Sequence, residues 1–172
     1  MVVTFADYKM KESENSIILW LVFLNLIKES NTDALTNVLN KRGFDEVYML
    51  QKKISLRYKR NLSLILMDIK DLKSVNNLQG HKMGNKLLCL FTKTVSNEIR
   101  SADILCRIGG DEFALILPET DYNQAKILLQ RIINEINKFD INISYGLTDN
   151  NIDQDLFEMA DQKLIQNKNV RM

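Results

Sequence analysis

Residues 107–118 read RIGGDEFALILP. Strand-forming apolar residues precede this stretch at Ile104 and Leu105 and fill it from 113 to 117. Two glycines and two carboxylates between two such runs are typical of a β-hairpin turn, so the sequence predicts a hairpin over 104–117. Glycine is needed where the chain turns at positive φ or where a ligand lies directly on the backbone. A purely structural turn would need Gly-Asp but not the second acid, so this turn is also a candidate ligand site.

A further carboxylate, Asp68, ends an apolar run that reads LSLILM at 62–67. A continuous apolar run of this length predicts a strand that is buried on both faces, over 62–69. Carboxylates at the end of such a strand and at a neighbouring hairpin are costly to crowd unless a cation shares the site. Asp68, Asp111 and Glu112 therefore indicate a site for a hard cation such as Mg²⁺, which binds through one or two carboxylates together with substrate phosphates.

Length and charge limit the classes of protein to consider. The chain of 172 residues is long enough for one domain with a short extension, and 45% hydrophobic with 26% charged residues is ordinary for a globular protein. A formal net charge of +1 gives no general attraction to anionic polymers or lipids, so no nucleic-acid polymer is expected as a partner. Cys89 and Cys106 lie in apolar runs without metal or disulfide spacing, and we expect both to be reduced core residues of a cytoplasmic protein.

The N-terminal segment, residues 1–32, carries one apolar run that reads IILWLVFLNLI at 17–27. This run is too short to cross a bilayer, which takes about 20 apolar residues, so no membrane span is expected in the chain. Lys9 and Lys11 are offset by nearby acids and no small-residue cleavage site follows, which argues against a signal peptide. We expect a helix that packs against the domain or against a second copy of the chain; a truncated membrane helix is the alternative.

The rest of the chain predicts helices that alternate with strands. Asp33 is expected to cap a helix with an apolar stripe that includes Leu35 and Val38. Further helices are expected at 44–58, 83–100, 122–139 and 155–167, a loop at 70–82 and a strand at 141–147. The helix over 44–58 would turn Phe44, Val47, Leu50 and Ile54 inward. This order fits an α/β (α+β) sandwich with a mixed central β-sheet flanked by helices.

Five blocks of the sequence occur in a characteristic order. They read DALTNVLNKRGF (33–44), MDIKDLKSVNNLQGHKMGN (67–85), RSADILCRIGGDEFALILPET (100–120), INISYGLT (141–148) and ADQKLIQNK (160–168). In identity and spacing they resemble the GGDEF family, the diguanylate cyclases. The resemblance covers residues 33–172, so it implies a GGDEF domain over that range with the palm-like fold of nucleotide cyclases.

The resemblance implies the condensation of two GTP molecules into cyclic diguanylate, with release of two pyrophosphates. Mg²⁺ or Mn²⁺ would be the cofactor. Carried over from the family, its ligands fall on Asp68, the main-chain carbonyl of Ile69 and Asp111. Asp111 is also the usual candidate for general base, and Glu112 would complete the acidic site. In such a reaction the protein contributes positioning and electrostatics.

Phosphate binding is implied for another set of residues. Gly109 and Gly110 would let the phosphates approach the backbone, and Lys73 and Lys168 match family lysines that sit on phosphate. Lys70 is a departure, because the family usually has a second Asp there, and it places a positive charge near the metal site unless its stem carries the ammonium outward.

Guanine would be read by Asn76 and by residue 85, where the family usually has Asp and this chain has Asn85. A carboxylate accepts both N–H groups on the guanine edge, whereas an amide offers one acceptor and one donor group. A buried mismatch of this kind costs roughly 1–3 kcal/mol, which predicts weaker selection of GTP. His81 has no partner His or Cys for a metal, so we expect it to orient the loop or to touch the substrate.

A product-inhibition site is also implied. Arg100-Ser101-Ala102-Asp103 is an RxxD at the family's distance from Gly109, where Arg100 and Asp103 would grip cyclic diguanylate. Arg131 stands where a second arginine often completes that site.

The first interpretation is therefore a diguanylate cyclase that works as a homodimer, because each active site holds one GTP and the cyclic product needs two. The alternative is a catalytically impaired GGDEF domain that acts as a nucleotide-binding or dimerising signalling module. Asn85, Lys70 and the irregular C-terminus, where Arg171 stands one residue early, favour the alternative.

Overall fold

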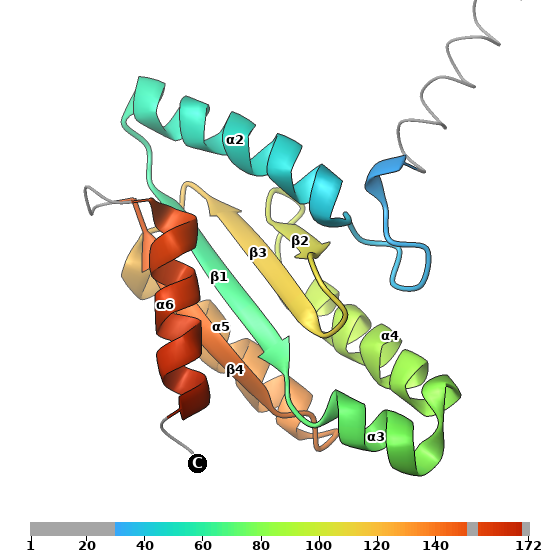
Figure 1. Cartoon of the computed structure of the whole chain (residues 1–172). Helices are drawn as coiled ribbons and strands as arrows, with labels where there is room; N and C mark the ends of the chain where they lie inside the picture. The colour runs from blue at the N-terminus through green and yellow to red at the C-terminus, as the bar shows by residue number, and fades with distance from the viewer. Residues whose placement is uncertain (1–29, 151–154, 170–172) are drawn as a thin grey trace, which may run out of the picture.

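The computed structural model describes residues 30–150 and 155–169 (Figure 1). In these residues the elements follow in the order α2 (Lys41–Tyr58), β1 (Leu62–Ile69), α3 (Leu72–Gln79), α4 (His81–Glu98), β2 (Ile104–Arg107), β3 (Glu112–Pro118), α5 (Tyr122–Asn137), β4 (Ile143–Asp149) and α6 (Leu156–Asn169). Figure 1 shows one sheet with α2 and α6 on one face and α4 and α5 on the other. The predicted α/β sandwich is confirmed.

The four strands lie in the order β2-β3-β1-β4, and every pairing between them is antiparallel. The sequence predicts a mixed sheet, which would contain parallel pairs. In the described residues the one parallel contact is an isolated bridge between Leu39 and Cys106. The strand predicted over 62–69 is confirmed as β1, and the predicted hairpin is confirmed as β2 and β3. Because β1 and β3 are antiparallel neighbours with Asp68 opposite Glu112, the end of β1 and the hairpin turn come together at one end of the sheet.

Strand β1 is apolar throughout because both of its faces are covered. Successive side chains of a strand point to opposite faces. Ile65 and Met67 belong to the hydrophobic cluster that packs under α4 and α5. Leu64 and Leu66 belong to a second cluster, which packs under α2 and α6. The sheet therefore separates two cores, and a rigid central strand carries Asp68 at its end.

Helix α3 is a correction to the sequence analysis, which expects a loop at 70–82. The sequence of α3, LKSVNNLQ, has apolar residues at 72, 75 and 78, but Leu72 is its one buried residue and Leu78 is 84% exposed. A spacing of three over only eight mostly polar residues is a short helical signal, and the sequence analysis does not use it. Gly80, with φ of +79°, ends α3 and starts α4 at once, a backbone conformation that favours glycine.

The helix predicted from Asp33 is a second correction. The chain turns between Asp33 and Leu39 instead, and the Asp33 N–H donates to the Val38 carbonyl at 2.8 Å. The Asp33 side chain does cap main-chain donors as expected, but it accepts from Thr36 in a turn.

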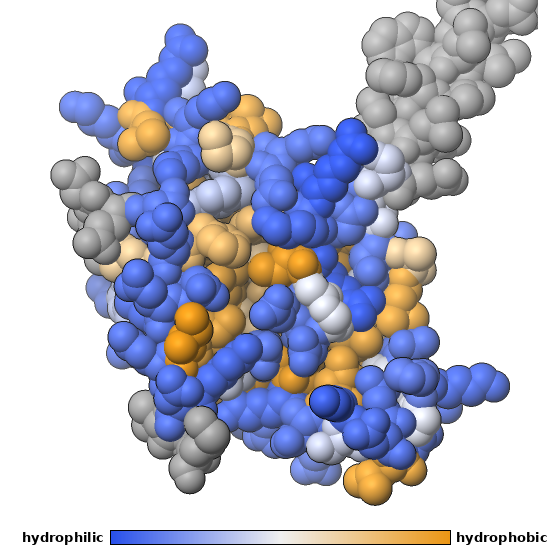
Figure 2. Space-filling model, in the orientation of Figure 1, coloured by the Kyte–Doolittle hydropathy of each residue, from blue (hydrophilic) through white to orange (hydrophobic). Residues whose placement is uncertain are grey.

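Helix α2 begins at Lys41, earlier than predicted, and its inner face includes the predicted Phe44 and Val47 but not Leu50. Phe44 and Tyr48 are buried, but Leu50 is 54% exposed. Phe44 and Tyr48 are one helical turn apart and stack with ring centroids 5.4 Å apart. This stacked pair, rather than Leu50, faces the sheet. Figure 2 shows that the face with α2 and α6 is mostly hydrophilic, with hydrophobic atoms gathered in the middle, where the sheet lies between these helices.

The cysteines are both free thiols but differ in burial. Cys106 is a core residue as expected, and burial raises the pKa of its thiol to about 12. Cys89 is exposed, so the prediction that it is a core residue is wrong; its thiol donates to the Leu35 carbonyl at 3.4 Å.

The apolar run at 17–27 lies outside the described residues, so its predicted helix stays a prediction. Within residues 30–150 and 155–169, no helix combines the length and the apolar character that crossing a bilayer requires.

Gly146 of β4 is where helix α6 lies directly on the sheet. A Cβ atom at this position would be 1.9 Å from the Ala160 carbonyl oxygen and 2.7 Å from the Leu164 nitrogen. Both contacts are with backbone, so α6 would have to move. We expect Gly146→Ala to lower the free energy of unfolding by roughly 3 kcal/mol.

Urea denaturation measures this change. Gly110→Ala is the matched control, because a Cβ atom at Gly110 meets nothing within 4 Å and its φ is not positive. A Gly146→Ala protein as stable as the Gly110→Ala protein would show that α6 does not lie this close to β4.

Candidate active site

The turn between β2 and β3 is held by its own backbone. The N–H groups of Ile108 and Gly109 donate to the Glu112 carbonyl at 2.9 and 3.2 Å. A Cβ atom on Gly109 would lie 2.5 Å from Oε2 and 3.1 Å from Cβ of Glu112, so a side chain there would collide with Glu112. Neither Gly109 nor Gly110 has a positive φ, which excludes that reason for the two glycines. Gly110 borders open space, so its backbone is accessible to a ligand.

The end of β1 is tied to this turn. The Ile69 N–H donates to the Asp111 carbonyl at 3.0 Å, and Asp68 lies opposite Glu112 in the antiparallel register. The three predicted acidic residues therefore come from two adjacent strand ends. The main-chain bond fixes the position of Asp111 without using its carboxylate, which has no hydrogen bond or ion pair within the described residues.

A cation already lies on Asp68. The Lys168 Nζ atom, from the last turn of α6, donates to Asp68 Oδ2 at 2.6 Å. The two side chains are 39% and 14% exposed, respectively, so the pair is partly shielded from water. Lys168 is predicted to bind phosphate, but in the structure it binds the carboxylate of Asp68.

A cleft of about 460 Å³ lies between the hairpin turn and the helices α3 and α4. Its lining residues are Leu72, Lys73, Asn76, Asn77, His81, Asn85, Leu88, Arg107, Gly110 and Asp111. Six predicted site residues are thus brought together: Lys73, Asn76, His81, Asn85, Gly110 and Asp111. The other predicted residues of the site do not line this cleft: Asp68, Ile69 and Glu112 lie at strand ends, Gly109 in the hairpin turn and Lys168 on α6.

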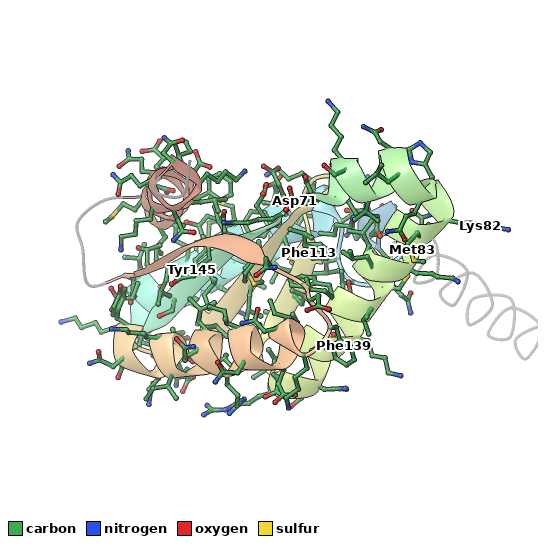
Figure 3. The ribbon with its side chains drawn as sticks, turned by 90° about the horizontal axis from the view of Figure 1, so that it is seen from below. Asp71, Lys82, Met83, Phe113, Phe139 and Tyr145 are labelled. Carbon is green, nitrogen blue, oxygen red and sulfur yellow. The ribbon has the colours of Figure 1, made fainter. Side chains whose placement is uncertain are left out.

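The far wall of the cleft depends on close packing of α3 against α4. A Cβ atom on Gly84 would lie 2.0 Å from Asn76 Oδ1, so the Asn76 side chain rests directly on this glycine. Asn85, the next residue of α4, lines the same cleft. Figure 3 shows Lys82, by contrast, pointing away from the domain at the start of α4. Of residues 80–85, His81 and Asn85 line the cleft.

Arg107 and Asp33 belong to the site but are missed by the sequence analysis. The Arg107 guanidinium donates to both Asp33 carboxylate oxygens, at 3.1 and 3.2 Å, and to the Gly110 carbonyl at 2.7 Å. Burial on its own raises the pKa of Asp33, but hydrogen bonds from Thr36 and Arg107 and the Arg107 charge outweigh it and hold the pKa below its usual value. Asp33 therefore stays ionised at neutral pH and anchors Arg107, which holds the hairpin turn.

Oxygen donors at the strand ends suit a hard divalent cation. Among residues 30–150 and 155–169, no group of three or more His, Cys, Asp or Glu side chains is close enough to hold a metal. A site made of two carboxylates, one main-chain carbonyl and ligand phosphates does not need such a group. The ammonium on Asp68 shows that this carboxylate accepts a cation in the folded protein.

The predicted RxxD residues also come together, on another surface. A hollow of about 190 Å³ is lined by Glu98, Arg100, Asp103, Thr120, Gln124, Ile127, Leu128 and Arg131. Asp103 accepts a hydrogen bond from the Arg100 N–H at 2.8 Å, which closes the turn before β2. Arg131 pairs with Glu98 at 2.5 Å. All three residues predicted for product inhibition thus line one hollow.

A known protein family matches this sequence. The family described as "Diguanylate cyclase, GGDEF domain" matches residues 30–172. Diguanylate cyclase DgcM of Escherichia coli is 32% identical over 147 residues, which cover 80% of this chain and 36% of that protein. Diguanylate cyclase A of Treponema denticola is 28% identical, over 95% of this chain and 49% of that protein. The chain thus spans half or less of the length of these relatives.

Solved structures share the fold. The coiled coil and GGDEF domain of DgcB from Caulobacter crescentus, crystallised in complex with c-di-GMP, aligns with a TM-score of 0.85 at 19% identity, over 98% of this chain and 96% of that one. The active GGEEF domain of a diguanylate cyclase from Vibrio cholerae aligns with a TM-score of 0.70 at 25% identity, over 77% and 92% of the two chains. Fold and site together define an α/β domain with an acidic strand-end site beside a polar cleft. The chain belongs to the GGDEF family of diguanylate cyclase domains.

Proposed function

We propose that this protein is a diguanylate cyclase, which condenses two GTP molecules into cyclic diguanylate and releases two pyrophosphates. The observation that carries the proposal is the cleft, where Lys73, Asn85 and Asp111 from separate elements line one space. Each of these residue types suits one part of GTP. An ammonium group can bind the phosphates, an amide can hydrogen-bond to the base, and a carboxylate can accept the proton of the reacting hydroxyl.

The roles follow from position in the cleft. Asp111 would accept the proton of the attacking 3′ hydroxyl, because its carboxylate has no other partner in the described residues and borders the cleft. The open backbone at Gly110 would lie against the phosphates, with Lys73 on their other side. Asn76, Asn85 and His81 would surround the base or orient the loop. Glu112 would add negative charge at the strand end.

The metal ligands would be Asp68, the Ile69 carbonyl and Asp111, whose main chains are joined at the strand ends. Mg²⁺ or Mn²⁺, when bound there, would neutralise charge on the phosphoryl oxygens. Lys168 would then leave Asp68 and become available to a phosphate. A homodimer is part of the proposal, since one cleft holds one GTP and the product contains two.

Equilibrium binding tests the site assignment. We expect GTP with Mg²⁺ to bind the parent protein and to bind the Lys73→Ala protein about tenfold more weakly, because a charge-assisted hydrogen bond to phosphate is lost. Lys82→Ala is the matched control, since Lys82 belongs to α4 but points away from the domain (Figure 3). Isothermal titration calorimetry measures all three. Equal losses in the two variants would place GTP elsewhere.

Feedback inhibition by the product is proposed for the RxxD hollow. The Arg100 guanidinium is the cation of this hollow without an ion pair in the described residues, whereas Arg131 is held by Glu98. We expect Arg100→Ala to relieve inhibition by cyclic diguanylate and to leave the initial rate unchanged, because this hollow shares no lining residue with the cleft.

Initial rates at increasing cyclic diguanylate measure this effect. Arg57→Ala on α2 removes an arginine far from the hollow and should leave inhibition as it is. If calorimetry finds the same product affinity in Arg100→Ala as in the parent, the RxxD does not bind the product.

A second function is favoured by two residues. Asn85 faces the cleft where an acid would pair with guanine, and Lys70 adds a positive charge just after the end of β1. These two departures from the usual family residues would weaken catalysis more than folding. The alternative is thus an impaired GGDEF domain that binds nucleotide, or pairs with a second copy, without turnover.

A further inference from the structure

Strand β4 is an edge strand whose free side lies in a groove between α5 and α6. It pairs with β1 on one side, and the sheet order places no described strand on its other side. Two hollows of about 240 and 230 Å³ follow this side and share Gln130, Ile133, Tyr145 and Asn167, so they form one continuous trough. Figure 3 shows α6 and α5 on opposite sides of β4, with Tyr145 in the layer toward α5.

The register shows which main-chain groups face the trough. The Asn142 carbonyl accepts from the Lys70 N–H at 2.9 Å, so even-numbered residues of this segment direct their main chain at β1. Tyr145 and Leu147 therefore direct theirs outward. Two α6 side chains reach this edge: Asn167 accepts from the Tyr145 N–H at 3.4 Å, and Lys163 donates to the Leu147 carbonyl at 2.7 Å.

Between these two bonds, one acceptor and one donor remain open. Within residues 30–150 and 155–169, the Tyr145 carbonyl and the Leu147 N–H have no hydrogen-bond partner. Side chains that cap an edge strand are replaceable, since an added strand supplies the same bonds from its backbone. The bond from Asn167 is also long for a strong hydrogen bond.

The positive charge of the trough favours an acidic peptide strand as its ligand. Lys126 and Lys163 line it, and its lining in the described residues contains no carboxylate. Lys126 is exposed and makes no ion pair there. A second copy of the same edge would bring lysines against lysines, which disfavours pairing of the protein with itself. An acidic strand would meet both ammonium groups.

We propose that the β4 edge is a docking site for an extended acidic peptide segment of a partner protein, which adds to the sheet as a further strand. The partner's backbone pairs with the Tyr145 carbonyl and the Leu147 N–H, and its carboxylates pair with Lys126 and Lys163. The site lies away from the candidate active-site cleft, with which it shares no lining residue.

The probe is a seven-residue peptide that alternates valine and glutamate, with both ends blocked. The full chain is titrated with it, and amide hydrogen exchange is followed by NMR. We expect the Leu147 amide to exchange freely without peptide and to become protected at least about tenfold at saturation. Gly146 and Thr148 are internal controls, because their amides face β1 and are protected throughout.

Two changes separate strand addition from general attraction. Methylating the peptide nitrogens that would pair with the edge should abolish binding, and Lys126→Glu should weaken it about tenfold. Lys53→Glu on α2 makes the same charge change on an exposed residue elsewhere and should have no effect. Unchanged exchange at Leu147 with millimolar peptide would overturn the proposal. So would equal binding of the methylated peptide, or equal losses in the two lysine variants.

Discussion

Replacing Asp111 by alanine is expected to abolish turnover of GTP and to leave the fold intact. The Asp111 carboxylate borders the cleft and has no partner in the described residues, so its loss removes no stabilising contact. The main-chain bond from Ile69 to the Asp111 carbonyl, 3.0 Å long, does not depend on the side chain. A general base alone contributes roughly 10²–10⁴ in rate, and Asp111 is also a proposed metal ligand. We therefore expect a loss of about a thousandfold or more.

Initial rates of pyrophosphate release measure this loss, and urea denaturation checks that stability is retained. Asp45→Ala is the matched control, since it removes an exposed acid on α2 that pairs with Lys41. An Asp111→Ala protein that makes product at the parent rate would show that the acidic site is assigned wrongly.

The second large effect concerns the choice of base. Guanine presents two donors on its edge, and a carboxylate at position 85 accepts from both, whereas the amide of Asn85 accepts from one. We expect Asn85→Asp to recover part of the roughly 1–3 kcal/mol of the mismatch and to raise the ratio of GTP to ATP affinity about tenfold or more. Calorimetry with GTP and ATP at the same Mg²⁺ concentration gives this ratio.

Asn77→Asp controls for charge. Asn77 lines the same cleft from α3, so the substitution adds the same negative charge near the ligand. We expect it to weaken both triphosphates alike and to leave their ratio unchanged. If Asn85→Asp also leaves the ratio unchanged, residue 85 does not read the base.

The sequence predicts the central strand and the hairpin, because both rest on strong local patterns, but not that every strand pairing is antiparallel. The run over 62–69 is apolar without interruption, and the structure covers β1 on both faces. The hairpin is marked by glycines between two apolar runs. The six cleft residues are implied by the resemblance to the GGDEF family, and the structure brings them to one cleft.

What the sequence does not predict depends on tertiary contacts. Helix α3 is eight residues long and buries only Leu72, and Asn76 packs onto Gly84 of α4, a contact that a local pattern does not show. The sequence predicts Asp33 as a helix cap. In the structure its carboxylate accepts hydrogen bonds from Thr36 in a turn and from Arg107, 74 residues further along the chain. The contact between Lys168 and Asp68 joins residues 100 positions apart. No local pattern carries such pairs.

The product of GTP turnover tests the central proposal most directly. Purified protein is incubated with GTP and Mg²⁺ and, separately, with GTP and Mn²⁺, and the nucleotides are resolved by mass. We predict a species with the mass of cyclic diguanylate, formed together with two pyrophosphates per molecule of product and absent from the Asp111→Ala reaction. Binding of GTP without any such product, with both metals, would contradict the proposal that this GGDEF domain is a cyclase and would leave the nucleotide-binding module in its place.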